Sequence, residues 1–387
     1  MKILIATDFY IHNLGGVTTS ILALCAGLRS QGHEVKILTL SDRHESFRDG
    51  DEYYIRSFKA YYSPGVRFTV DFNDPLLKEL EQWKPDIIHV HSEGTALTMA
   101  IRIAKHCDVP LVMTAHTDYA YFTFGKLKDL GLVKAFVTFV GGIAYKQAEK
   151  IVVPSQKALN FPFLSKFSDR LVVVPNGIEM DKYQKKLSED EKLKMRKQLG
   201  IADKEKILVT VTRLSKEKNI EELIDYFPAL LEKDPDIKLL IVGDGPDRKH
   251  LEKLASKYHL DEKVIFVGRQ SAKDVWRYYD LADIFVSAST FEVHSMSYLE
   301  ALALGLPFLC RADEALGNVV DHNYNGMIYF TREEFVEFAC RMLGDDELRK
   351  QMGLNSLEKC EEFSAEQFAL NMSRLYEEVI RESENEL

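Results

Sequence analysis

The feature that most constrains the fold is a repeated alternation of short apolar runs with longer segments of helical periodicity. In the first half of the chain the runs cover residues 2–7, 35–39, 87–91, 111–115, 151–154 and 171–175. Each run is nearly continuous in apolar residues, as in strands that are covered on both faces. Strands that alternate with helices favour a parallel α/β architecture. The sequence therefore predicts parallel sheets with helices on both sides.

The alternation stops and then starts again, which predicts a second domain. A segment rich in lysine and glutamate, residues 182–200, is typical of a solvated helix, and apolar runs resume at 207–212. Because 387 residues exceed what one hydrophobic core usually organises, two domains are expected. We predict an N-terminal domain over 1–180 and a C-terminal domain over 181–362, facing each other across a cleft. The last helix, 363–387, comes after the second domain is complete, so we expect it to cross back onto the first.

Composition excludes several classes of protein. The chain is 46% hydrophobic and 28% charged, as expected for a soluble globular protein. Asp8 interrupts the first apolar run too early for a signal peptide or a membrane span, which predicts a cytoplasmic location. The cysteines are scattered without paired spacing, so neither a disulfide framework nor a zinc site is expected. A net charge of −10 argues against general nucleic-acid binding, and the oligomeric state stays open.

Two acidic residues flank the start of a predicted helix in the second domain. Glu292 lies in a loop after an apolar run, and Glu300 lies about two turns into the helix that begins near Ser295. The backbone N–H groups of Ser295 and Met296, between the two acids, would form an anion site at the helix N-terminus. Two carboxylates beside an anion site suggest a ligand that carries both hydroxyls and phosphates.

Two cations follow another run of the second domain. Arg213 and Lys218 come directly after residues 207–212. Ligands of open α/β sheets bind beyond the carboxyl ends of the strands, where we expect these residues to lie. The cations would neutralise a diphosphate leaving group there.

The first domain offers glycines and a histidine at comparable positions. Gly15 and Gly16 lie between a strand and a helix, where their amides would approach a phosphate or merely form a tight turn. His116 ends an apolar run among polar residues, which favours a functional role over a structural one. His89 and His91 alternate within a strand, and a structural role is preferred for both.

These motifs, taken together, resemble the retaining glycosyltransferases of family GT4, which have the GT-B fold of two Rossmann-like α/β/α domains. The resemblance extends over essentially the whole chain, and its strength is that the motifs occur in the expected order. They are Gly15-Gly16, His116, Arg213 with Lys218, Val242-Gly243-Asp244-Gly245-Pro246, Phe266-Val267-Gly268, and Glu292 with Glu300.

The resemblance implies a role for each predicted site residue of the second domain. Glu300 would hold the ribose hydroxyls of a nucleotide diphosphate sugar, and Glu292 a hydroxyl of the sugar. The diphosphate would bind Arg213 and Lys218 together with the amides of Gly16 and of the Ser295-Met296 turn.

Further implied roles concern the sugar, the base and the chemistry. His116 would lie beside the sugar on the acceptor side, and the backbone near Val267 and Arg269 would contact the base. No metal or other cofactor is implied, and no Asp-x-Asp pair follows a strand. His294 and Ser295 depart from the family pattern, so the donor sugar, with UDP-glucose or UDP-galactose favoured, is left open.

The acceptor is predicted from residues that follow His116. Tyr119 and its aromatic neighbours resemble the corresponding stretch of bacterial enzymes that glucosylate diacylglycerol. Lys126, Lys128 and Lys134 interleave with apolar residues, which would lay a basic amphipathic surface on anionic lipid. This favours a peripheral enzyme on the inner membrane face with a membrane-lipid acceptor. A buried helix with a solvated edge explains the same pattern, and a polysaccharide or other soluble acceptor is the alternative.

Two other classes of protein share a paired α/β architecture. A sugar-nucleotide epimerase would require acids and histidines arranged for elimination chemistry. A two-lobed solute-binding protein would bind free sugar without turnover, but Arg213, Lys218 and Glu300 disfavour it.

Overall fold

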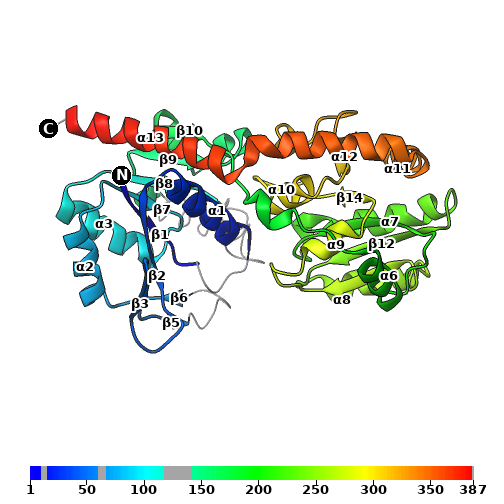
Figure 1. Cartoon of the computed structure of the whole chain (residues 1–387), viewed down its shortest axis with the longest axis horizontal. Helices are drawn as coiled ribbons and strands as arrows, with labels where there is room; N and C mark the ends of the chain where they lie inside the picture. The colour runs from blue at the N-terminus through cyan, green and yellow to red at the C-terminus, as the bar shows by residue number, and fades with distance from the viewer. Residues whose placement is uncertain (10–14, 60–66, 117–141, 162, 386–387) are drawn as a thin grey trace. The chain divides into compact units, whose positions relative to one another are not determined.

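The chain folds into two compact units that both contain a sheet. The computed structural model describes residues 1–387 except 10–14, 60–66, 117–141, 162 and 386–387 (Figure 1). One unit comprises Met1–Ile178 and Ser364–Leu387, and the other comprises Glu179–Phe363. The C-terminal segment therefore returns to the first unit, and the division after Ile178 lies close to the predicted boundary at residue 180.

The first unit is built on a mostly parallel sheet. Within the described residues the sheet has eight strands in the order β10-β9-β8-β7-β1-β2-β4-β3, and only β3 runs antiparallel to its neighbour. The strands are β1 (Lys2–Ala6), β2 (Glu34–Leu40), β3 (Phe47–Asp49), β4 (Glu52–Ile55), β7 (Ile87–Val90), β8 (Leu111–Thr114), β9 (Lys150–Val153) and β10 (Leu171–Val173). β7 and β8 are buried along their whole length, which explains why their sequences show no polar alternation. A separate hairpin pairs β5 (Phe58–Lys59) with β6 (Arg67–Phe68).

Helices cover this sheet, and the last helix of the chain belongs to the cover. They are α1 (Gly16–Ser30), α2 (Pro75–Trp83), α3 (Thr95–Cys107) and α13 (Ala365–Asn385), with 3-10 turns η2 (Gln156–Asn160) and η3 (Ser165–Arg170). α13 lies beside α1 (Figure 1), and Phe368, Met372 and Leu375 share one buried cluster with Ile21 and Leu24. Because this packing buries apolar surface on both helices, the returning segment is part of the first core.

The second unit has a fully parallel sheet with the strand order of a dinucleotide-binding domain. Its order in the described part of the chain is β13-β12-β11-β14-β15-β16, which in chain order is 3-2-1-4-5-6. The strands are β11 (Lys206–Val211), β12 (Ile237–Val242), β13 (Val264–Gly268), β14 (Ile284–Ser287), β15 (Phe308–Arg311) and β16 (Gly326–Tyr329).

The helices of the second unit follow from clear local signals. They are α6 (Glu189–Gln198), α7 (Ile220–Leu231), α8 (Arg248–Lys257), α9 (Trp276–Asp280), α10 (Met296–Ala303), α11 (Arg332–Gly344) and α12 (Asp346–Cys360), with 3-10 turns η4 (Met180–Tyr183), η5 (Lys216–Lys218), η6 (Glu314–Leu316) and η7 (Glu361–Phe363). α6 begins with a capping box of Ser188 and Glu191 and buries no residue, so it is the solvated helix that the sequence predicted. Gly305, with φ of 70°, ends the segment that carries α10 in the left-handed conformation that glycine adopts readily.

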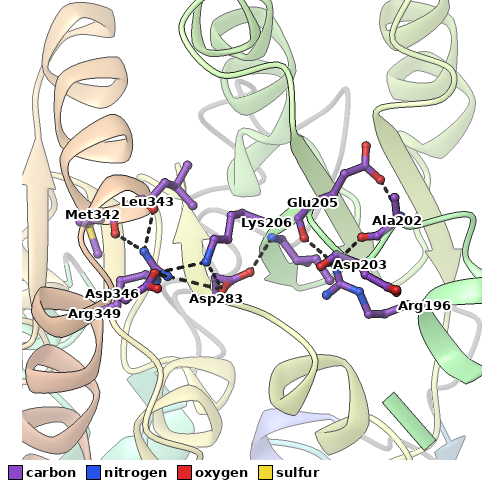
Figure 2. Close-up of polar contacts among 11 residues, drawn as sticks. Arg196, Ala202, Asp203, Glu205, Lys206, Asp283, Met342, Leu343, Asp346 and Arg349 are labelled. Carbon is purple, nitrogen blue, oxygen red and sulfur yellow. Dashed lines mark hydrogen bonds and ion pairs between the residues drawn. The ribbon is translucent and has the colours of Figure 1, made fainter. Parts of the chain in front are cut away.

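A polar network braces the amino-terminal edge of the second sheet (Figure 2). Asp283, just before β14, accepts a 2.8 Å hydrogen bond from the amide of Ile207 in β11. Arg349 donates to the carbonyls of Met342 and Leu343 at 2.6 and 2.8 Å and also pairs with Asp346, so it joins α11 to α12. Asp283 therefore braces the start of β14 against β11.

A shallow pocket of about 400 Å³ opens beside this network. Several of its charged groups already have partners: Asp280, for example, accepts from Lys186 at 3.1 Å and from the amide of Leu187 at 2.8 Å. The pocket lies at the amino ends of β14 and β15, opposite to the edge where parallel sheets bind ligands. The candidate site therefore lies at the other, carboxyl edge of this sheet and not in this pocket.

Candidate functional site

In the second unit the predicted cations and the loop acid follow neighbouring strands. β11 and β14 lie side by side at the point where the strand order reverses, which is where ligands of such sheets bind. Arg213 and Lys218 follow β11, and Glu292 follows β14. The topology therefore brings these side chains to one carboxyl edge, as the sequence predicted.

Lys218 and Glu292 form a partly desolvated ion pair. Their Nζ and Oε1 atoms are 2.7 Å apart, and their side chains are 19% and 9% exposed. Asn219 ends the 3-10 turn of Lys218 in the left-handed region, with φ of 50°, and its amide group donates to the carbonyl of Ala288 at 3.3 Å. Asparagine tolerates this conformation better than most residues, which explains why glycine is not required there. Lys218 is thus held beside the Glu292 loop.

Two tyrosines hold Glu300. The hydroxyl of Tyr279 donates to Oε2 at 2.7 Å, and the hydroxyl of Tyr183 donates to Oε1 at 3.1 Å. Burial raises the pKa of Glu300, whereas these two hydrogen bonds act in the opposite direction. Each carboxylate oxygen keeps a further lone pair for a ligand hydroxyl. Sequence reasoning missed both tyrosines.

The start of α10 leaves its first amides without a side-chain cap. Ser295 occupies the N-cap position, but its side chain makes no capping hydrogen bond and instead lies 3.0 Å from the hydroxyl of Ser297. The first amides of a helix without such a cap are available to an anion. His294, just before it, is buried and packs against Phe363 at 5.4 Å between ring centroids, and burial lowers its pKa to about 4. Its ring is therefore neutral near pH 7.

The remaining predicted residues of the second unit lie nearer solvent. Arg213 is exposed directly after β11. Val267 is partly buried within β13, and Arg269 is exposed after it. Since β12 separates β13 from β11, the residues predicted to contact the base lie farther along the same sheet than the cations.

In the first unit the predicted glycines begin α1, which follows β1 in the chain. Gly15 is the N-cap of α1 with φ of −153°, an extended conformation that any residue adopts, and Gly16 is the first helical residue. A left-handed backbone is therefore not the reason for Gly15. β1 is flanked by β2 and β7, where the strand order of this sheet reverses, so the glycines follow a switch-point strand.

His116 lies just beyond β8 and is joined to another histidine. Its Nε2 atom is 2.9 Å from Nδ1 of His91, which follows β7. Burial lowers the pKa of His116 to about 4, so the ring is neutral near pH 7. The sequence predicted a functional role for His116 and a structural role for His91.

The remaining predictions concern the acceptor-binding residues, a metal site and a membrane span. Tyr119, Lys126, Lys128 and Lys134 lie outside the described residues. Among the residues that the structure describes, no three or more His, Cys, Asp or Glu side chains are grouped as a metal site would require. No helix in this part of the chain is both long and apolar enough to cross a bilayer.

Solved structures with the same architecture define the class of protein. Anabaena HepE, solved in complex with UDP-glucose, has a TM-score of 0.74 at 18% sequence identity, over 98% of this chain and 100% of that one. Sucrose-phosphate synthase from Thermosynechococcus elongatus gives the same TM-score at 19% identity, over 98% and 100% of the two chains. Together with the two parallel sheets, these similarities establish the GT-B fold of two Rossmann-like domains.

Sequence comparisons then define the family. The model described as "Glycosyltransferase Family 4" matches residues 14–182, and that described as "Glycosyl transferases group 1" matches residues 191–359. An alpha-monoglucosyldiacylglycerol synthase of Streptococcus pneumoniae is 30% identical over 98% of this chain and 86% of its own length. An enzyme of the same name from Acholeplasma laidlawii is 27% identical over 100% and 99%. The chain belongs to glycosyltransferase family 4, as the motifs predicted.

Proposed function

We propose that the protein is a retaining, metal-independent glycosyltransferase that transfers a hexose from a UDP-sugar to a hydroxyl of a membrane lipid, with diacylglycerol as the favoured acceptor. The observation that carries the proposal is the Lys218–Glu292 pair at the switch point of the second sheet, with the uncapped start of α10 following the same loop. This arrangement combines a cation and amides for phosphate with a carboxylate for a hydroxyl.

Charge development in the reaction explains the cations. Cleavage of the anomeric bond leaves negative charge on the diphosphate and positive charge on the sugar ring. Arg213, Lys218 and the first amides of α10 would stabilise the diphosphate, and they do so most strongly in the transition state, where its charge is greatest. Glu292 would accept a hydrogen bond from a sugar hydroxyl, and Glu300 would accept from the ribose. Arg213, Lys218 and the amides would thus stabilise the charge of the leaving diphosphate, as a bound metal does in other enzymes.

Retention of configuration follows from family membership rather than from a protein nucleophile. We propose attack by the acceptor on the face that the diphosphate leaves, with the departing phosphate taking the acceptor proton. No side chain is therefore assigned as the base. His116 would contact the sugar from the first unit.

The names of the relatives support a lipid acceptor, and a solved complex supports the nucleotide. Both relatives described above are named alpha-monoglucosyldiacylglycerol synthase. HepE was solved with UDP-glucose. We therefore favour UDP-glucose as donor and a protein that works at the cytoplasmic face of the membrane without spanning it.

The decisive experiment is a donor screen with lipid acceptors. Purified protein would be incubated with radiolabelled UDP-glucose, UDP-galactose and GDP-mannose, with vesicles of diacylglycerol and anionic phospholipid, in the presence of EDTA. We expect label from a UDP-hexose in the lipid fraction and an α-linked product. Soluble glycans would be offered as acceptors in parallel reactions, and label in them but not in the lipid fraction would refute the lipid acceptor. Loss of activity with EDTA that added metal restores would refute metal independence.

A second incubation distinguishes a transferase from a sugar-nucleotide epimerase. The UDP-sugar would be incubated without acceptor and its sugar identified afterwards. A changed sugar would indicate an epimerase and refute the transferase proposal.

A further inference from the structure

Three histidine rings form a row at the carboxyl edge of the first sheet. His89 lies in β7, His91 follows β7, and His116 follows β8. The ring centroids of His89 and His91 are 4.0 Å apart, and those of His91 and His116 are 5.2 Å apart. His89 is 0% and His91 3% exposed, so the row leads from the core to the partly exposed His116.

The inner end of the row is fixed by hydrogen bonds. The Nδ1 atom of His89 lies 2.6 Å from the hydroxyl of Tyr376 in α13, and its Nε2 atom lies 2.7 Å from the hydroxyl of Thr114 in β8. Both ring nitrogens of His89 thus have partners. The His89 ring provides a fixed surface on which the ring of His91 packs.

The outer pair shares one proton. Burial holds the pKa of His116 at about 4 and that of His91 well below its usual range, so both rings are neutral near pH 7. A neutral imidazole has one N–H donor and one lone-pair acceptor. Across the 2.9 Å contact of His91 Nδ1 with His116 Nε2, one nitrogen must therefore donate and the other must accept.

The second ring nitrogen of His91, Nε2, indicates which histidine donates the hydrogen bond between His91 and His116. This atom is buried and has no hydrogen-bond partner among the described residues. A buried N–H without an acceptor is rarer in native proteins than a buried acceptor without a donor. The hydrogen of His91 is therefore best assigned to Nδ1, which donates to His116 Nε2, and the hydrogen of His116 is then on its Nδ1.

We propose that His91 is a positioning residue that holds His116 in the Nδ1-protonated tautomer, so that His116 presents a single N–H donor to a hydroxyl oxygen of the bound sugar. The identity of that ligand rests on the proposed function, whereas the tautomer does not. With Nε2 engaged by His91, His116 has no free lone pair to take a proton from the acceptor. His116 is then a hydrogen-bond donor and not a general base.

The tautomer is tested directly by 15N NMR of ligand-free protein labelled at histidine, because protonated and unprotonated ring nitrogens have well-separated shifts. His116 signals would be assigned by their loss in His116→Gln. We expect wild-type His116 to be protonated at Nδ1 and bare at Nε2. The reverse assignment would overturn the proposal.

Two substitutions at His91 separate its hydrogen bond from its packing. His91→Phe keeps a ring on His89 but removes the donor, and we expect His116 to become a mixture of tautomers. His91→Asn keeps an amide N–H near the position of Nδ1, and we expect it to retain the wild-type tautomer. An unchanged His116 spectrum in His91→Phe would contradict the proposal.

Steady-state kinetics of the His91 variants test whether the tautomer matters for sugar transfer, with Thr114→Val as the matched control. We expect His91→Phe to lower kcat about tenfold with KM for the sugar nucleotide within about twofold, and His91→Asn to recover most of the loss. Thr114→Val removes a partner of His89 without touching the outer pair, so it should lower thermal stability but leave kcat unchanged. If Thr114→Val lowers kcat as much as His91→Phe, the row is structural only. If wild-type protein transfers no sugar, the proposed function fails, and the NMR result still decides the tautomer.

Discussion

At the residue scale, the Lys218–Glu292 pair is the most specific feature of the candidate site. Removing one partner of a partly desolvated pair leaves the other charge without its hydrogen bond. We expect Lys218→Ala to weaken binding of the UDP-sugar by about 10- to 100-fold, since it would also remove a proposed phosphate ligand. Glu292→Gln should lower kcat about 10- to 100-fold with a smaller effect on UDP affinity. Calorimetry with UDP and steady-state kinetics would measure the two effects.

Lys216 provides the matched control for these substitutions. It lies on the same 3-10 turn as Lys218 but is exposed, and no ion pair joins it to Glu292 in the described structure. Lys216→Ala should therefore bind UDP like the wild type. Full activity of either Lys218→Ala or Glu292→Gln would refute the assignment of this pair.

The tyrosines that hold Glu300 predict how nucleotide binding depends on pH. In the proposed complex, ribose hydroxyls donate to the Glu300 carboxylate, so we expect affinity to fall as the pH drops through the pKa of Glu300, which burial has raised. The Tyr183 hydrogen bond lowers that pKa, and its removal should raise it further. We expect UDP affinity of Tyr183→Phe to begin its decline at a higher pH than in the wild type, measured between about pH 5 and pH 8.

Tyr298 supplies the comparison for this effect. Tyr298 is a buried tyrosine of α10, the helix that carries Glu300, but its hydroxyl donates to the hydroxyl of Ser287 at 2.8 Å. Tyr298→Phe should alter stability and leave the pH dependence of UDP binding unchanged. Superimposable pH profiles for Tyr183→Phe and the wild type would show that Tyr183 does not tune Glu300.

At the element scale, the contact between α1 and α13 depends on a glycine. A Cβ atom built on Gly27 would lie 2.7 Å from Cβ of Ala369 and would collide with the carbonyl oxygen of Ala365. Gly27→Ala should gain about 1 kcal/mol of helix propensity. The loss is larger, because the helices must separate, and overpacking typically costs about 1–3 kcal/mol. We expect a net loss of stability, seen as a lower urea midpoint.

Gly344 offers an open site for the same substitution. It is the last residue of α11, and a Cβ atom there would meet nothing within 4 Å. Gly344→Ala should therefore be neutral or slightly stabilising. Equal stability of Gly27→Ala and the wild type would mean that α1 and α13 can adjust their spacing without cost.

Elements were predictable from the sequence where their signal was periodic. The buried strands followed from apolar patterning, because burial on a strand or helix face repeats at a fixed spacing. The return of the last helix followed from its position after a second domain that was already complete. Gly27 was not predicted, since a close approach of helices leaves no periodic trace. The contact of Tyr183 with Glu300 spans 117 residues, and a hydrogen bond between such distant positions has no local signature. The positions of the cations and of Glu292 were predictable because strand ends are marked in the sequence.

At the scale of the whole molecule, the chain passes from the first unit to the second and back. The second unit, Glu179–Phe363, is continuous and has its own core, which includes Leu208, Phe227 and Leu309. The first unit is discontinuous, and residues of α13 complete the cluster that covers α1. The two units should therefore differ in whether they fold when separated.

We expect a fragment of residues 179–363 to unfold cooperatively, because it keeps its whole sheet and core. A fragment of residues 1–178 should bind a hydrophobic dye and lack a cooperative transition, since the face of α1 that α13 covers would be exposed to water. Coexpression with residues 364–387 should restore the transition, because the added helix returns Phe368, Met372 and Leu375 to that face. Cooperative unfolding of 1–178 alone, at the stability of the restored pair, would show that α13 is peripheral to the first core.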